Sequence, residues 1–185
     1  MASGEFDVTL AAAKRGDASG LARLYANYRP AVLQFFRGQD PAEAEDLTSD
    51  VFVSVARSLG RFRGDEPGFR SWLFTIAHRR LTDHRRRRAR RPSEPLPPEH
   101  LVRHGTQGDA EWDAMSVVGT TTAISRIASL PSAQAEVLLL RVVADLSVTE
   151  VSRIVGRNPP AVRALQYRAL RRLAGEFELA REGAL

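Results

Sequence analysis

The spacing of hydrophobic positions along the chain is that of helices. Apolar residues recur three and four positions apart through most of the sequence, and strict strand-like alternation is absent from it. A short helix is expected from about Asp7 and a longer one from about Asp17, with a kink at Pro30. The apolar stripe of the longer helix comprises Leu21, Leu24, Tyr25, Tyr28, Val32, Leu33, Phe35 and Phe36. The predicted fold class is all-α.

Two more helices are expected in the N-terminal half. Asp40-Pro41-Ala42-Glu43 has a capping residue, a proline and an acid in the order of a helix start. The apolar side of the helix that begins there comprises Leu47, Val51, Phe52, Val55 and Leu59. Gly60 to Gly68 is expected to be a loop, and a further helix should run from about Phe69 toward Arg90. The buried face of that helix is expected to contain Trp72, Leu73, Ile76, Ala77 and Leu81.

A segment without periodicity separates the two halves of the chain. Residues 92–110 contain four prolines and two glycines and almost no periodic apolar pattern, which is typical of an interdomain linker. We therefore expect two small helical domains, residues 1–91 and 111–185, joined by a flexible linker, with helices resuming near Ala110. Because the linker has few apolar residues to dock the domains, the two halves should fold independently.

The C-terminal domain is predicted to end in a helix-turn-helix. Its last three helices are expected at Ser132 to Ala144, Ser147 to Val155, and Pro159 to about Phe177. Ser147-Val148-Thr149-Glu150 is a capping box, and Gly156 supplies the turn between the last two helices. This spacing is typical of a DNA-binding helix-turn-helix.

The last helix has one apolar side and one side suited to a nucleic acid. At about 100° per residue, Val162, Leu165, Ala169 and Leu173 face the preceding helix. The opposite side carries Arg163, Ala164, Tyr167, Arg168 and Arg171. Small residues allow close approach to the major groove, and long donors reach base edges and phosphates. The alternative is a solvated amphipathic helix in an ordinary bundle.

Positive charge is concentrated in one part of the chain. Basic residues outnumber acidic ones by 27 to 22, but residues 59–91 alone carry eleven basic and three acidic side chains. The dense tract within this segment is Arg79, Arg80, Arg85, Arg86, Arg87, Arg88, Arg90 and Arg91. Such a tract indicates a polyanionic partner, although a disordered basic tail or a patch for anionic lipids would also be basic.

The loop before the arginine tract mixes aromatic and basic residues. Phe62 and Arg63 lie within it and Phe69 and Arg70 follow it, and aromatics beside a basic groove are typical of proteins that hold unstacked bases. Aromatics at helical spacing more commonly belong to a core, so Phe69, Trp72 and Phe74 are expected to be mainly core. Only the loop itself is a candidate for base contacts.

Catalytic, metal-binding and membrane roles find no support in the sequence. The chain has no cysteine, which excludes disulfides and thiolate sites, and Lys14 is followed by arginine, so no phosphate loop is present. His78 and His84 do not share a helix face, and His100 with His104 lies in the linker. We expect no enzyme activity, cofactor, metal site or membrane insertion. A cytoplasmic location fits best, because no long apolar run or N-terminal signal occurs.

The acidic residues near position 45 form a surface of opposite charge to the arginine tract. Glu43, Glu45, Asp46 and Asp50 lie close to the start of their predicted helix, where acidic side chains favour the helix dipole. We interpret them as a partner-facing surface rather than as acid–base groups.

These segments, taken in order, resemble one protein family. They are Ala42 to Phe52, Phe62-Arg63-Gly64, Phe69 to Ala77, Asp83 to Arg88, Leu130-Pro131, Val137 to Arg141 and the helix-turn-helix. Together they resemble the extracytoplasmic-function sigma factors, the two-domain group of bacterial sigma factors. The resemblance implies that residues 1–91 correspond to sigma region 2 and residues 111–185 to sigma region 4.

The resemblance also implies partners and site residues. The chain would bind core RNA polymerase and promoter DNA, and an anti-sigma factor would regulate it. Polymerase-binding residues would be Glu45, Asp46, Leu47, Asp50 and Phe52. Residues for the minus-ten element would be Phe62, Arg63, Gly64, Asp65, Arg70, Arg79, Arg80, Arg86 and Arg87. Those for the minus-thirty-five element would be Pro160, Ala161, Arg163, Ala164, Tyr167, Arg168 and Arg171.

The chain departs from the family pattern at a few positions. Ser49 stands where a glutamine is usual, Pro159-Pro160 replaces a small residue and a glycine, and Gln166 replaces a leucine. The DNA sequence read by the last helix therefore cannot be transferred from relatives.

Two other classes of protein remain open at this stage. A stand-alone helix-turn-helix regulator would explain the C-terminal half but leaves the arginine-rich and acidic helices unused. A nucleic-acid or membrane-binding scaffold would explain the arginines but not the capped helix-turn-helix.

Overall fold

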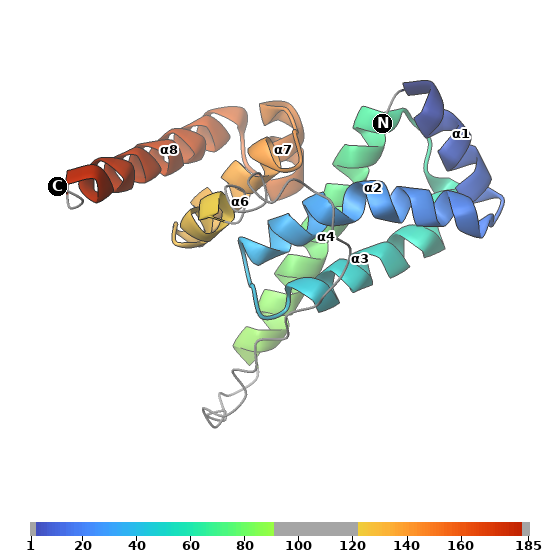
Figure 1. Ribbon diagram of the computed structural model, residues 1–185, viewed down its shortest axis with the longest axis horizontal. Coiled ribbons are helices and arrows are strands. Elements are labelled where there is room, and N and C mark those ends of the chain that lie inside the picture. The colour runs from blue at the N-terminus through green and yellow to red at the C-terminus, as the bar shows by residue number, and fades with distance from the viewer. Residues whose placement is uncertain (1–2, 91–121, 183–185) are drawn as a thin grey trace.

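The architecture is helical throughout the part of the chain that the structure describes. The computed structural model describes residues 3–90 and 122–182, which form helices, turns and loops with no strand among them (Figure 1). The expectation of an all-α fold with two helical domains is confirmed. The predicted linker at 92–110 and the resumption of helices near Ala110 lie outside the described residues.

The N-terminal domain is a bundle of four helices. They are α1 (Ser3–Lys14), α2 (Ala18–Arg37), α3 (Ala44–Ser58) and α4 (Glu66–Arg90), with the short 3₁₀ helix η1 (Leu59–Arg61) after α3. Asp17 caps α2 by accepting a hydrogen bond from the Ser19 backbone N–H, and its hydrogen bonds with Ser19 hold the pKa of this carboxyl below its usual value. The helix α2 continues through Pro30.

Aromatic side chains fill the core of this bundle. Phe6, Phe35, Phe36, Phe69 and Phe74 have no exposed surface. The predicted buried positions in α2, α3 and α4 are largely confirmed, with Leu21, Phe52, Trp72 and Ile76 packed only partly against the core. The exception lies in the predicted stripe of α2, because the side chain of Tyr25 is 41% exposed.

The start of α3 differs from its sequence signal. The helix begins at Ala44, and Glu43 rather than Asp40 occupies the capping position, without a side-chain cap. The Asp40 carboxylate instead lies 3.1 Å from His84 Nε2 and 3.1 Å from an Arg88 guanidinium nitrogen, both on α4. These long-range partners take the carboxylate away from the local capping role. At the next turn, Asp65 accepts from the Gly68 N–H, so α4 begins at Glu66 and the preceding loop is shorter than expected.

The C-terminal domain contains the predicted helix-turn-helix. Residues 122–128 are helical and precede α6 (Ser132–Val142), α7 (Val148–Val155) and α8 (Pro159–Glu182). The capping box of Ser147 and Glu150 is present in full. Gly156 ends α7 with a φ of 65°, a left-handed conformation that glycine adopts without strain. The three expected helices are therefore confirmed to within a few residues.

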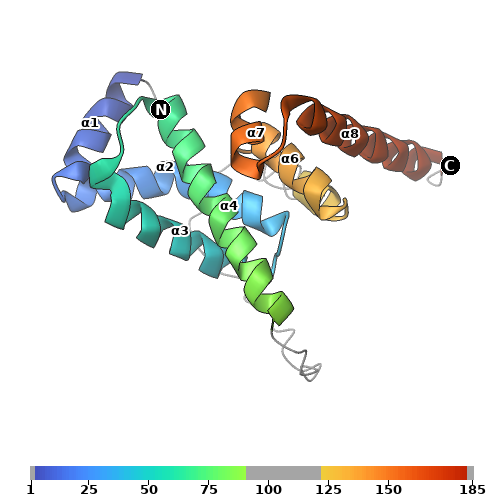
Figure 2. The same cartoon turned by 180° about the vertical axis from the view of Figure 1, so that it is seen from behind.

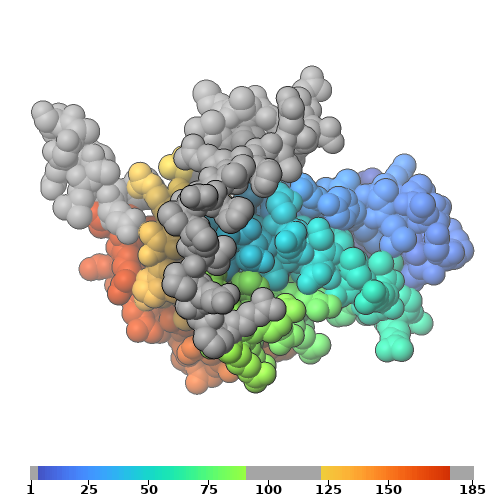
Figure 3. All heavy atoms as spheres, turned by 90° about the horizontal axis from the view of Figure 1, so that it is seen from below, coloured from blue at the N-terminus to red at the C-terminus, as the bar shows by residue number. Residues whose placement is uncertain are grey.

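The two bundles contact each other directly. α7 lies against α4 and α6 against α2, and buried residues of both domains form one continuous apolar cluster (Figures 1 and 2). In the space-filling view, atoms of α4 lie beside atoms of the C-terminal helices (Figure 3). No local pattern in the sequence predicts this contact, because it joins helices that are far apart along the chain. Independent folding of the halves stays a prediction.

The buried side of α8 leads to a stability prediction. Leu165 is 8% exposed, whereas Leu170 on the same helix is 48% exposed. Leu165→Ala should lower the free energy of unfolding of the C-terminal bundle by about 2–5 kcal/mol through the cavity it leaves, as measured by chemical denaturation. Leu170→Ala is the matched control and should change that free energy by less than about 0.5 kcal/mol. Equal effects of the two substitutions would contradict the assignment of the buried side.

Candidate nucleic-acid and polymerase interfaces

The first candidate surface is the outward side of α8. Val162 and Ala169 are fully buried, which fixes the rotation of the helix about its axis. The predicted contact residues on the other side are all exposed: Arg163, Ala164, Tyr167, Arg168 and Arg171. Pro160 is exposed as well, and Ala161 is partly buried, with its N–H bonded to the Asn158 side chain that caps the helix.

Exposure and helix position together define what this surface can contact. The Arg171 guanidinium lies 6.0 Å from the centroid of the Tyr167 ring, so the two side chains form one exposed group. A capped helix whose N-terminal half presents small residues and arginines has the form of a recognition helix in the major groove.

The second candidate surface is the loop between η1 and α4. The Phe62 ring is 8% exposed and packs on Phe69 and Trp72, with ring centroids 5.4 and 5.1 Å apart. In this conformation the ring belongs to the core and does not face solvent, unlike the expectation for a base-contacting residue. Arg63, Gly64 and Asp65 remain exposed.

Two features fix the shape of this loop. Gly64 has a φ of 146°, and a Cβ there would lie 3.2 Å from Cζ of Phe62, so a side chain at this position is disfavoured by both strain and contact. The Phe62 carbonyl accepts hydrogen bonds from Lys14 Nζ at 2.8 Å and from Arg63. Lys14 is the sole lysine of the chain, and its role was missed because no sequence signal connects positions 48 residues apart.

The arginines of α4 divide into exposed and engaged side chains. Arg79, Arg86 and Arg87 are exposed. Arg80 donates to Ser54 Oγ at 2.6 Å, and Arg70 forms an ion pair with Asp145 of the C-terminal domain at 2.9 Å. The predicted minus-ten arginines of α4 therefore lie along one helix, but Arg70 and Arg80 are bound to other elements.

A buried phenol lies close to Arg70. Tyr28 donates a hydrogen bond to Glu66 at 3.0 Å, and burial together with the Glu66 carboxylate raises the pKa of Tyr28, so the hydroxyl stays protonated. Glu66 also lies 3.6 Å from Arg70, which places a tyrosine, a carboxylate and a guanidinium in one group.

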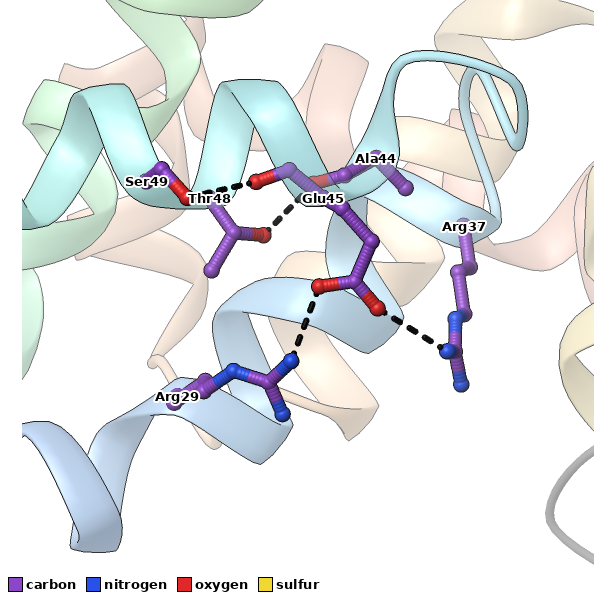
Figure 4. Close-up of polar contacts among 6 residues, drawn as sticks. All are labelled: Arg29, Arg37, Ala44, Glu45, Thr48 and Ser49. Carbon is purple, nitrogen blue, oxygen red and sulfur yellow. Dashed lines mark hydrogen bonds and ion pairs between the residues drawn. The ribbon is translucent and has the colours of Figure 1, made fainter. Parts of the chain in front are cut away.

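The third candidate surface lies on α3. Glu45 is held by Arg29 at 2.8 Å and by Arg37 at 3.3 Å, both from α2 (Figure 4). Asp46 and Asp50 are exposed, and neither forms an ion pair among the contacts of the described residues.

Two predicted polymerase-binding residues of α3 have roles inside the bundle. Leu47 is 3% exposed and cannot reach a partner in this conformation, because it belongs to the core of the bundle. Phe52 is partly buried edge-to-face against the exposed Tyr25, at 4.8 Å between centroids. Val53, which the sequence analysis did not single out, is 48% exposed and extends the surface.

Within residues 3–90 and 122–182, no cluster of three or more metal-ligating side chains occurs. None of the helices described in these ranges is long and apolar enough to cross a membrane.

Comparison with protein families covers most of both domains. Residues 24–91 match the model of sigma-70 region 2, and residues 123–173 match that of sigma-70 region 4. The first match contains α3, the loop and α4, and the second contains α6, α7 and the exposed side of α8.

Comparison with curated proteins gives relatives over nearly the whole chain. The chain is 33% identical over 164 residues to the ECF RNA polymerase sigma factor BldN of Streptomyces coelicolor, covering 88% of this chain and 62% of BldN. It is 31% identical over 180 residues to the ECF RNA polymerase sigma factor SigD of Mycobacterium tuberculosis, covering 92% of this chain and 83% of SigD. The chain thus spans somewhat under two thirds of the length of BldN.

Solved structures support the same fold. CnrH, in complex with the cytosolic domain of CnrY, aligns with a TM-score of 0.60 at 21% identity, covering 93% of this chain and 96% of CnrH. The sigma factor RpoE of Bartonella quintana, in complex with the anti-sigma factor NepR, aligns with a TM-score of 0.62 at 21% identity, covering 85% and 96% of the two chains. With both family models matched in order and these relatives along its length, the chain belongs to the extracytoplasmic-function sigma factors of the sigma-70 family.

Proposed function

We propose that this chain binds core RNA polymerase and directs promoter-specific initiation of transcription. The observation that carries the proposal is the exposed side of α8, where every predicted arginine and the tyrosine face solvent on a capped helix-turn-helix. Membership of the sigma factor family supports the same function. RNA synthesis belongs to the polymerase in this account, and we propose no catalytic activity for the chain itself.

Each candidate surface has a distinct part in this proposal. The α8 side reads the minus-thirty-five element through base edges in the major groove. The loop and the exposed arginines of α4 hold the minus-ten element. Capture of a flipped base there can occur in two ways. Either Phe62 moves out of its buried position, or the exposed loop residues hold the base without it. The acidic side of α3 binds the polymerase, with Asp46 and Asp50 as its free carboxylates.

Location and regulation follow from the same proposal. Core polymerase and promoter DNA are in the bacterial cytoplasm, where we propose that the chain acts. Regulation by an anti-sigma factor stays an expectation from the family resemblance.

The discriminating experiment compares promoter binding with and without polymerase. A sigma factor should give a specific complex with duplex promoter DNA only after core polymerase is added. The competing function, a stand-alone helix-turn-helix regulator, requires tight binding of the chain alone. Retardation of a promoter fragment by the purified chain at nanomolar concentration, unchanged by core polymerase, would favour the regulator.

The acidic surface of α3 gives the first functional prediction. Asp46→Ala combined with Asp50→Ala should weaken association with core polymerase by about tenfold, or about 1.4 kcal/mol, because two exposed carboxylates are lost. The measurement is a fluorescence titration with core polymerase. Glu5→Ala combined with Asp7→Ala, which removes two exposed carboxylates from α1, is the control and should leave the affinity unchanged. Unchanged affinity of the α3 variant with a native circular dichroism spectrum would contradict the assignment.

The exposed arginines of α4 give a prediction about salt. Arg86→Ala combined with Arg87→Ala should weaken promoter complexes on all promoters alike, because phosphate contacts carry no sequence information. Each lost contact should reduce the slope of log affinity against log salt concentration by about 0.9. A variant with a changed promoter preference and an unaltered slope would show that these residues read bases.

The exposed side of α8 gives a prediction about which promoter sequences the chain prefers. Arg163, Tyr167 and Arg171 recur at intervals of four on the exposed side. If Arg163 makes a bidentate contact with a guanine, Arg163→Ala should weaken promoter binding by about 1–3 kcal/mol and relax discrimination at one base pair. Competition with a set of promoter variants measures both effects. Arg172→Ala is the control, because Arg172 lies about 180° around the helix from Arg163. Unchanged preference in the Arg163 variant would contradict the assignment.

A further inference from the structure

The helix α1 has no part in the function proposed above. It precedes the segment that matches sigma-70 region 2, which begins at residue 24. Nevertheless, α1 contacts η1 and α4, the two elements on either side of the candidate base-contacting loop. Figures 1 and 2 both show α1 beside the segment that joins α3 to α4. A side chain of α1 is therefore within reach of the loop.

Lys14, the last residue of α1, makes the contact with the loop. Its Nζ donates a hydrogen bond of 2.8 Å to the Phe62 carbonyl and lies 5.7 Å from the centroid of the Phe62 ring. One ammonium group thus contacts both the backbone and the aromatic ring of the same loop residue. Because its donor is charged, this hydrogen bond is stronger than one between neutral groups. Lys14 therefore restrains the peptide group between Phe62 and Arg63.

The position of Lys14 is itself fixed by the core. Phe6, on the same helix, is fully buried, and its ring centroid lies 5.5 Å from that of Phe69. Near the other end of α1, Gly20 of α2 packs so closely that a Cβ on it would lie 2.5 Å from the backbone nitrogen of Ala13. Rotation or sliding of α1 would break these close contacts. The ammonium group therefore reaches the loop from a rigid support.

The other hydrogen bonds of the loop are local. Arg63 donates to the carbonyls of Gly60 and Phe62, and Asp65 accepts from the Gly68 N–H. Among the described residues, every hydrogen bond of residues 62–65 except that from Lys14 stays between positions 59 and 69. The adjoining helices hold the two ends of the loop, and Lys14 supplies the link to a distant part of the chain.

The exposed loop residues follow the restrained peptide group directly. Arg63, Gly64 and Asp65 are all exposed. Gly64 has a φ of 146°, in a region of backbone conformation that glycine adopts readily, so this loop has conformational freedom to lose when it binds a ligand. A contact surface that is ordered beforehand loses less freedom on binding. An external restraint on this loop therefore favours recognition by its exposed residues.

We propose that Lys14 is a positioning residue for the loop of residues 62–65, and that it holds Arg63, Gly64 and Asp65 in the conformation that selects the unstacked base of the minus-ten element. Lys14 acts through the Phe62 carbonyl and does not itself contact the base. Phe62 then stays in the core, and the exposed loop residues hold the base without it. The role in promoter selection rests on the proposed function, whereas the restraint of the loop does not.

Three variants of the full chain separate the hydrogen bond from the charge. Lys14→Met removes the donor but keeps an unbranched side chain, and Lys14→Arg keeps a charged donor. Arg15→Met is the matched control, because Arg15 is the neighbouring residue, is exposed and carries the same charge. The two methionine variants have equal net charge, so general attraction to DNA affects both alike.

Backbone order in the free chain tests the restraint of the loop. Nitrogen-15 relaxation should give order parameters of about 0.85 for the Arg63 and Gly64 amides in the unsubstituted chain, in Lys14→Arg and in Arg15→Met. In Lys14→Met these two values should fall below about 0.6, while amides of α3 and α4 remain near 0.85.

Two results on the free chain would overturn the restraint. One is loop order parameters that are equal in the unsubstituted chain and in Lys14→Met. The other is loss of the folded state in Lys14→Met, which would show that Lys14 supports the whole bundle rather than the loop.

Promoter binding in the presence of core polymerase tests the positioning role. The probes are duplex promoters with single-base changes in either the minus-ten or the minus-thirty-five element. Lys14→Met should reduce discrimination at one minus-ten position by about fivefold, because the loop must then be ordered on binding, and should leave discrimination in the minus-thirty-five element unchanged. Lys14→Arg and Arg15→Met should retain discrimination in both elements.

The outcomes separate this proposal from the proposed function. Unchanged minus-ten discrimination in Lys14→Met, or an equal loss in both elements, would overturn the positioning role. Failure of the unsubstituted chain to form any promoter complex with core polymerase would overturn the proposed function and the positioning role with it. The order parameters of the free chain would still decide whether Lys14 restrains the loop.

Discussion

The structure depends on α4 being buried along one side and charged along the others. Phe69, Leu73, Phe74, Ala77 and Leu81 supply the buried side and hold α1, α2 and α3 in one bundle. The remaining positions carry the densest positive charge of the chain. Because one helix has both roles, the core fixes which arginines face outward, and the stability of the N-terminal domain is coupled to the geometry of its candidate DNA-binding surface.

The same helix also carries the polar contacts between the two domains. An arginine-rich surface repels itself until anions neutralise it. Asp145 and Glu136 of the C-terminal domain pair with Arg70 and His78 on one side of this helix, and under the proposed function DNA phosphates would neutralise the exposed Arg79, Arg86 and Arg87. The carboxylates of the C-terminal domain thus engage one side of α4 and leave the exposed arginines of its other sides available to a polyanion.

Local signals in the sequence predicted the helices well and the individual site residues less well. The capping box at Ser147, the turn at Gly156 and the exposed side of α8 each depend on residues within a few positions, and the structure has them as expected. Asp40 and Phe62 differ from expectation because each is decided by distant parts of the chain, whereas Leu47 is buried as the apolar pattern predicts, although the family resemblance gives it a contact role. His84 and Arg88 take the Asp40 carboxylate, and the core takes Leu47 and Phe62. The pairing of Glu136 with α4 has no local signal, since it joins residues 58 positions apart.

The central claim is that this chain gives RNA polymerase its promoter preference. Its most direct measurement is transcription in vitro from fragmented bacterial genomic DNA, with core polymerase and the purified chain, followed by mapping of the 5′ ends of the transcripts. We expect new start sites that share two upstream sequence elements with centres about 25 base pairs apart, one for each domain. Start sites identical to those of core polymerase alone, or start sites that share only one element, would contradict it.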